Sequence, residues 1–414
     1  MAFDATAWLP ALVLFMLFAY WIHVGKLFSK LGFTSKEVIA IFAIKCGWCL
    51  LNAWLHWAFQ NGGDTYDFFQ IGAQVHRALF RDAKDFFALV FLPNEWFVTE
   101  GLHHYYRSVS TYGNEDSFLL VRLNALFYLV SFGSYPAHLI LFSFVTLPGV
   151  LLLLRFAYDH VKFDKRWVNG LVLLFPGVAL WCNGMHKEAL AFSGLGYLLY
   201  TLASIRHQSV SLTAIELVVI GLVHFVARWY LPILLLPVFV SVYLYRQRFT
   251  RKLVGTMSAA AILTIATLLY VGFQFGVTKR VVDKLHAFNQ LSIDESSKVN
   301  SVTDIVRLIP QGLYNGFVAP LPFNAGFNAQ SAVYFLLNMV ALLIPFVLFR
   351  QLNPYRFVKF GIWFIGVALI GITALGIVVP HAGAIQRYKA PLVVIWLLGW
   401  LLSVSVKRFK TVEM

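Results

Sequence analysis

Long apolar runs alternate with short polar segments along most of this chain. A membrane-crossing helix needs about 20 predominantly apolar residues, and many of these runs approach or exceed that length. The pattern therefore predicts an all-α, polytopic transmembrane bundle of about 11 to 12 helices. The predicted spans are residues 7–25, 37–59, 136–157, 168–182, 189–204, 212–226, 229–245, 254–276, 331–349, 358–379 and 390–406.

A further apolar run, residues 118–132, contains Arg122 and Asn124. It could cross the membrane as a short span or lie in the interface. Lys and Arg concentrate in cytoplasmic loops, which assigns the basic clusters 246–252 and 350–359 to that side. Loop 60–117 then lies on the opposite face only if the segment 118–157 crosses the membrane an odd number of times. Residues 136–157 are predicted to cross it once, so this count favours the interfacial position for run 118–132.

Two long loops are expected within what we take to be one transmembrane domain, residues 1–414. Residues 60–117 mix charged and aromatic side chains, a composition typical of amphipathic helices at headgroup level. Residues 277–330 end in a proline-stiffened apolar segment that suits a re-entrant loop. We expect both loops on the external face, together with the short connections 183–188, 227–228 and 380–388.

The amino-acid composition is typical of a protein that lies mostly in the lipid bilayer. Residues of the types AVILMFWYC make up 59% of the sequence and charged residues only 13%, against about 25% in soluble domains. The unbroken runs exclude a transmembrane β-barrel, which needs alternating polarity. The net charge of +14 sits in clusters between apolar runs, so it is typical of a multi-pass membrane protein and does not indicate a nucleic-acid partner.

The segment Asn61–Asp67 places two carboxylates and two glycines directly after a predicted span. Asp64 and Asp67 are three residues apart, so a helix beginning here would carry both on one face. A carboxylate at a membrane boundary is costly unless something uses it. The functional interpretation is a general base or a metal-binding carboxylate, and the structural one is a helix cap with a solvated loop acid.

A second polar segment, Asn183–Glu188, joins two predicted spans. Lys187 and the start of the following helix could both attract a phosphate, with His186 beside them. Glu188 would suit the positive end of the helix dipole. The structural alternative is an inter-helix turn with a routine charge pair.

Two more polar segments are predicted on the same face. His224 and Arg228 share a helix face, and Arg is well suited to phosphate recognition, although a snorkelling Arg is an equal alternative. Basic residues at 387 and 389 break the positive-inside pattern, which an anionic lipid would explain, unless the span is wrongly placed. The candidate substrate-binding residues here are Gln386, Arg387 and Tyr388.

Metal binding receives little support from the sequence. His103 and His104 are adjacent and would point in different directions on a helix, and no third ligand stands at a helpful spacing. We predict no metal site and no required cofactor, although a divalent cation could assist Asp64.

Together these segments resemble polytopic glycosyltransferases of the GT-C type that use polyprenyl-phosphate sugars, and bacterial exopolysaccharide polymerases. Gly62-Gly63-Asp64 resembles the acidic motif of their first external loop, and Asn183–Glu188 and Arg387-Tyr388 resemble two further segments. The acidic loop follows the second apolar run here, where the family usually places it after the first, and a large soluble C-terminal domain is missing from the sequence.

The resemblance implies transfer or polymerisation of sugars on the periplasmic face, from an undecaprenyl-phosphate-type donor to a glycan or lipid acceptor. Asp64 would then be the catalytic base, with Asp67 or Glu188 orienting the acceptor. Lys187, Arg228 and Arg387 would hold the phosphate. The main alternative is a transporter or flippase of lipid-linked oligosaccharide, which should show internal repeats and broken helices near mid-membrane. A structural subunit would need no convergent charges.

Overall fold

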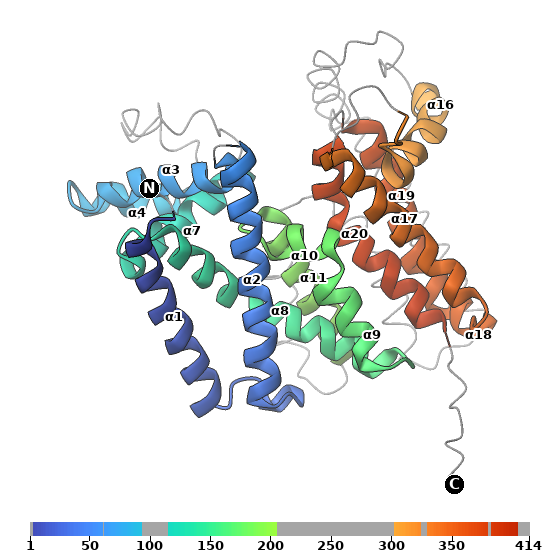
Figure 1. Cartoon of the computed structure of the whole chain (residues 1–414), viewed down its shortest axis with the longest axis horizontal. Helices are drawn as coiled ribbons and strands as arrows, with labels where there is room; N and C mark the ends of the chain where they lie inside the picture. The colour runs from blue at the N-terminus through green and yellow to red at the C-terminus, as the bar shows by residue number, and fades with distance from the viewer. Residues whose placement is uncertain are drawn as a thin grey trace. The chain divides into compact units, whose positions relative to one another are not determined.

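The computed structural model describes residues 3–60, 62–92, 115–204, 302–323, 329–379 and 382–404. Within these ranges the secondary structure is helical and contains no β-strand (Figure 1), which confirms the predicted all-α class. The predicted spans 212–226, 229–245 and 254–276 lie outside the described residues.

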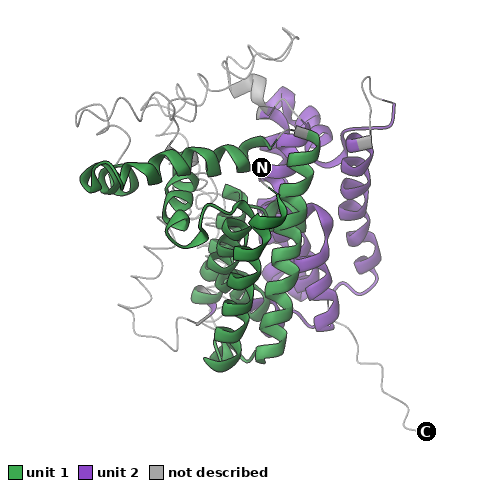
Figure 2. Cartoon of the chain, turned by 60° about the vertical axis from the view of Figure 1, so that its left-hand side comes forward, with its two compact units in different colours: residues 1–155, 179–201, 206–231 green, residues 156–178, 202–205, 232–414 purple. Residues whose placement is uncertain are grey.

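The chain forms two compact units (Figure 2). Unit 1 comprises residues 1–155, 179–201 and 206–231, and unit 2 comprises residues 156–178, 202–205 and 232–414. Three helices contribute residues to both units: α8 (Tyr135–His160), α10 (Pro176–Asn183) and α11 (Lys187–Ser204).

Unit 1 begins with the long helices α1 (Ala5–Val24) and α2 (Ser35–Gln60). The shorter α3 (Gly63–Ala78) and α4 (Ala83–Phe91) run across the ends of these helices rather than along them (Figure 1). They agree with the amphipathic helices expected in loop 60–117. Helix α7 (Glu115–Ser131) contains run 118–132 and packs along α3. Its interfacial position stays a prediction.

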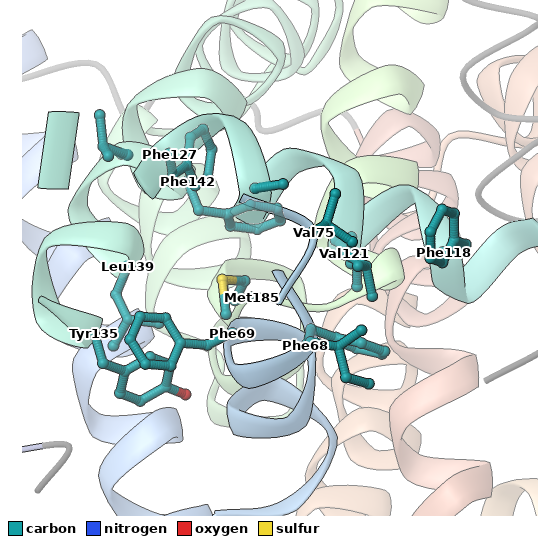
Figure 3. Packing of buried hydrophobic residues seen from close by; sticks show 14 of the residues in the cluster. Phe68, Phe69, Val75, Phe118, Val121, Phe127, Tyr135, Leu139, Phe142 and Met185 are labelled. Atoms are coloured by element: carbon teal, nitrogen blue, oxygen red, sulfur yellow. The ribbon is translucent and has the colours of Figure 1, made fainter. Parts of the chain in front are cut away.

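The turn from α2 into α3 depends on two glycines. Gly62 and Gly63 have φ of 111° and 57°, a region that side-chain-bearing residues rarely adopt. Behind the turn, buried residues of several helices form one apolar cluster (Figure 3), including Phe68 and Phe69 of α3 and Tyr135 of α8. Met185, just before α11, belongs to the same cluster, so α3 and the start of α11 share a core.

Helices α8 and α11 approach closely at two small residues. A side chain at Gly149 would lie 2.1 Å from the Ser193 carbonyl oxygen, and one at Gly196 would lie 1.8 Å from the Gly149 carbonyl oxygen. Small residues let membrane helices pack backbone against backbone in this way. This contact fixes α11, and therefore its first turn, within unit 1.

Unit 2 is built around two antiparallel helices, α19 (Ile362–Val378) and α20 (Ala382–Ser403), which pack against each other. Its other elements are α9 (Lys165–Asn169), a π-helical turn at Gly170–Leu174, α16 (Val302–Leu313), a π-helical turn at Tyr314–Val318, α17 (Ala329–Phe349), α18 (Pro354–Arg356) and a π-helical turn at Phe357–Gly361. Arg356 Nε donates to the Leu402 carbonyl oxygen over 2.8 Å, tying α18 to the end of α20.

Among the described residues, five helical segments are long and apolar enough to cross a membrane: Ala5–Val24, Ser35–Phe59, Tyr135–His160, Gln330–Phe349 and Pro354–Ile377. They correspond to predicted spans within a few residues and make the chain a membrane protein. The predicted span 168–182 is divided instead into α9, a π-helical turn and α10. Pro176 explains the break, because its ring prevents a continuous hydrogen-bonded helix.

Candidate functional site

A polar stripe runs along one face of α2. Lys45, Asn52 and His56 follow one another at intervals of seven and four residues, which keeps them on the same side of a helix. Lys45 and Asn52 are buried, with exposed fractions of 1% and 3%. Ionisable groups inside membrane helices are costly, so a buried Lys in this position is a strong indication of function.

The stripe faces the break between α10 and α11. Lys45 Nζ donates to Asn183 Oδ1 over 3.1 Å, and His186 Nε2 lies 2.9 Å from Asn52 Oδ1. The His186 ring is also 5.5 Å from the His56 ring. The segment Asn183–Glu188 therefore packs along α2 between Lys45 and His56.

Gly184 makes this close approach feasible. A side chain there would come within 2.7 Å of both Asn52 Oδ1 and the His186 ring. Beyond the turn, Lys187 and Glu188 form the first turn of α11 and are buried, with exposed fractions of 8% and 1%. Both charges of the predicted segment are thus inside unit 1.

Asp64 and Asp67 lie in the first turns of α3, where both are half-buried. The N-terminal capping position is Gly62, so Asp64 stands inside the first turn instead of capping it. The Gly62 amide donates to the His56 carbonyl oxygen over 3.1 Å, which ties this turn to the end of α2. Beside it, the Tyr135 hydroxyl donates to Thr65 Oγ1 over 2.9 Å.

Two of the predicted motifs therefore flank the same part of α2. The Gly62–Asp67 segment is bonded to His56, and the Asn183–Glu188 segment contacts both Asn52 and His56. Each motif supplies the start of a helix, where the backbone dipole favours anions. We call Lys45, Asn52, His56, Asn183 and His186 the α2 polar cluster.

Unit 2 holds a second polar cluster around Asn338. Its Oδ1 accepts hydrogen bonds from Lys389 Nζ over 2.6 Å and from Gln386 Nε2 over 3.1 Å, and Lys389 also donates to the Gly316 carbonyl oxygen over 2.7 Å. A cavity of about 20 Å³, roughly one water molecule, adjoins Gln386 and Lys389. Gln386 is therefore engaged within the protein rather than directed at a large pocket.

Arg387 and Tyr388 lie on the half-buried side of α20, with the guanidinium carbon 5.9 Å from the Tyr388 ring centre. Arg228 and His224 lie outside the described residues, as do His103 and His104. The expected convergence of Asp64, Lys187, Arg228 and Arg387 on one cavity thus stays a prediction. In the described part of the chain, no three His, Cys, Asp or Glu side chains are grouped as a metal site would require.

Sequence reasoning did not single out Lys45, Asn52 or Asn338. A signal was present for the first two, because Lys45 interrupts the apolar run 37–59 and stands two helical turns before Asn52. No signal marked Asn338, whose role depends on contacts with residues about 50 positions away along the chain. No family model, curated protein or solved structure matches the chain.

Proposed function

We propose that the protein is a GT-C type membrane glycosyltransferase that transfers or polymerises sugars from a polyprenyl-phosphate or -diphosphate donor on the periplasmic face. The supporting observation is that the Gly62–Asp67 and Asn183–Glu188 segments, more than a hundred residues apart, flank the same turns of α2. A carboxylate and buried cationic groups are what such a reaction needs near each other.

In the proposed reaction, the acceptor hydroxyl oxygen attacks the anomeric carbon as the bond to the donor phosphate oxygen breaks. Asp64 takes the hydroxyl proton, and the phosphate leaves with the bonding electrons and its negative charge. Lys187 and His186 stabilise this charge at the start of α11, while Asp67 or Glu188 orients the acceptor. Arg228, Arg387 and Tyr388 are the remaining predicted substrate contacts. A divalent cation could support Asp64, although the mechanism does not require one.

The first prediction concerns Asp64. Asp64→Asn keeps the size of the side chain but cannot accept the proton, so transfer should fall at least about a hundredfold. The measurement is sugar transfer from a lipid-linked donor in membranes that contain the full-length protein. Asp85→Asn is the matched control, because Asp85 stands in the first turn of the neighbouring helix α4 and should be dispensable. Normal transfer by both Asp64→Asn and Lys187→Met would disprove the enzyme hypothesis.

A flippase of lipid-linked oligosaccharide remains the second candidate, because of one observation. The α10–α11 break packs against α2 with buried charges, and broken helices with buried polar groups mark many transporter binding sites. Proteoliposomes without acceptor separate the two candidates. A flippase would move the lipid-linked oligosaccharide between leaflets without forming a glycosidic bond, whereas a transferase would release polyprenyl phosphate only when acceptor is present.

A further inference from the structure

Unit 1 contains a cavity of about 370 Å³ that is separate from the α2 polar cluster. It lies between α3, the end of α7 and the first residues of α1 and α8. Its main side chains are Tyr66, Phe69, His76, Arg77, Tyr128 and Tyr135. Asp64, Lys187 and the rest of the proposed catalytic set do not line it.

The polar groups of the cavity favour an anion. Of the described residues that line it, Arg77 carries the one permanent positive charge and none carries a carboxylate. Nδ1 of His76 is buried, and within the described part of the chain it has no hydrogen-bond partner. The Tyr128 ring stacks on the His76 ring at 5.5 Å. A guanidinium fork, two phenols and an imidazole suit a ligand with several acceptor oxygens, as phosphate has.

The walls of the cavity are aromatic and held in place. The Phe69 ring stacks on Tyr128 at 5.0 Å and on Tyr66 at 5.8 Å, and the Tyr135 hydroxyl is fixed by Thr65. Because these side chains are already ordered, binding of a ligand costs little conformational entropy of the protein. The volume exceeds that of a phosphate group, which leaves room for the polar substituent that a lipid headgroup carries.

The cavity lies at the ends of two candidate membrane spans. Ala7 and Tyr135, two of its lining residues, lie at the first turns of two candidate spans, Ala5–Val24 and Tyr135–His160. Large apolar side chains beside it are exposed, including Phe132 at 90% and Trp8 at 41%. The ends of spans mark the boundary between hydrocarbon and headgroups, so a bound headgroup here could keep its chains in lipid.

We propose that this cavity binds the phosphate headgroup of a membrane amphiphile, with Arg77 gripping the phosphate and Tyr66, Tyr128 and His76 completing its coordination. The phosphate could belong to an anionic glycerophospholipid or to an isoprenoid phosphate, since both present the same group at this depth. The inference does not rest on the proposed transferase activity.

The test is lipid binding by the full-length protein in detergent, followed by native mass spectrometry. The probes are phosphatidylglycerol, farnesyl phosphate and a phosphate-free diacylglycerol glycoside. We expect one or both phosphate lipids to bind and Arg77→Gln to weaken that binding by about ten- to a hundredfold, the usual range for a lost charge-assisted hydrogen bond. Arg81→Gln, which removes the same charge from a residue just after α3 that does not line the cavity, should bind as the unaltered protein does.

The result also identifies the source of the phosphate. Selective binding of phosphatidylglycerol assigns a bilayer lipid, and selective binding of farnesyl phosphate assigns an isoprenoid carrier. If Arg77→Gln fails to fold, Tyr128→Phe and His76→Gln should each weaken binding several-fold. Equal binding of the phosphate-free glycoside, or equal losses in Arg77→Gln and Arg81→Gln, would overturn the proposal. Sugar transfer is not measured, so a failure of the proposed function leaves this test unaffected.

Discussion

At the scale of single residues, Lys45 is the least expected side chain of the molecule. Its ammonium group is buried in a membrane helix and donates to the amide oxygen of Asn183. Replacing buried charged groups with apolar ones of similar volume is often neutral for stability. A Lys buried in α2 is therefore better explained by a role in function than by packing.

Lys45→Met tests that explanation. Methionine has similar length and no charge, so the variant should fold with an apparent melting temperature close to that of the unaltered protein. Sugar transfer should fall at least about tenfold, because the α2 polar cluster loses its cation. Melting is followed by size-exclusion chromatography after heating, and transfer in membranes. A stable variant with full activity would assign Lys45 a purely structural role.

His76 carries a prediction about pH. Burial lowers the pKa of its imidazole, opposed in part by a hydrogen bond with the backbone of Ala125. The ionisable neighbours are Arg77 and Tyr128 in the cavity and His138 nearby. Since protonation costs more in the folded than in the unfolded chain, stability should fall as pH drops below the ordinary value of 6.5.

The measurement for His76 is the melting temperature at neutral pH and at about pH 5. His76→Gln, which cannot be protonated, should lose less stability between the two conditions than the unaltered protein. An identical pH dependence in both proteins would show that His76 titrates normally.

At the scale of elements, small residues decide how closely helices approach. Gly196 of α11 fits against the Gly149 carbonyl oxygen of α8, so Gly196→Val should separate the helices and lower the apparent melting temperature by several degrees. Gly47→Ala in α2 is the control, because nothing lies within 4 Å of a side chain there. Thermal inactivation of both variants in detergent checks this, and equal melting would show that α11 is held by other contacts.

Most helices could be predicted because their apolar runs are a local property of the sequence. Helix α2 is an example: predicted as residues 37–59, it spans Ser35–Gln60. Thr34 and Glu37 explain its start, since each side chain accepts a hydrogen bond from the other's backbone amide. The packing of the Asn183–Glu188 turn against α2 could not be predicted, because it depends on pairing between Asn52 and His186 across 134 positions.

At the scale of the whole molecule, membrane orientation is the prediction that links the two units. Phe80 and Phe132 are exposed in the part assigned to the external face, and Tyr355 is exposed within a basic segment assigned to the cytoplasm. Cysteines placed at these positions should react with a membrane-impermeant reagent from opposite sides.

The three native cysteines are buried and should stay unlabelled, so the unaltered protein is the control. Labelling of Phe132→Cys and Tyr355→Cys from the same side would contradict the assigned topology. It would also remove the reason to place the candidate site on the periplasmic face.

The buried first turn of α11 has a consequence for biosynthesis. Lys187 and Glu188 would be costly to place in lipid before their protein surroundings exist. Helix α2, which supplies the complementary polar stripe, is synthesised more than a hundred residues earlier and can already be in the bilayer. If α10 and α11 insert as a pair beside an α2 that is already in the bilayer, their charged residues avoid that cost. Variants of Asn52 should therefore reduce the yield of inserted protein before they affect the stability of the finished one.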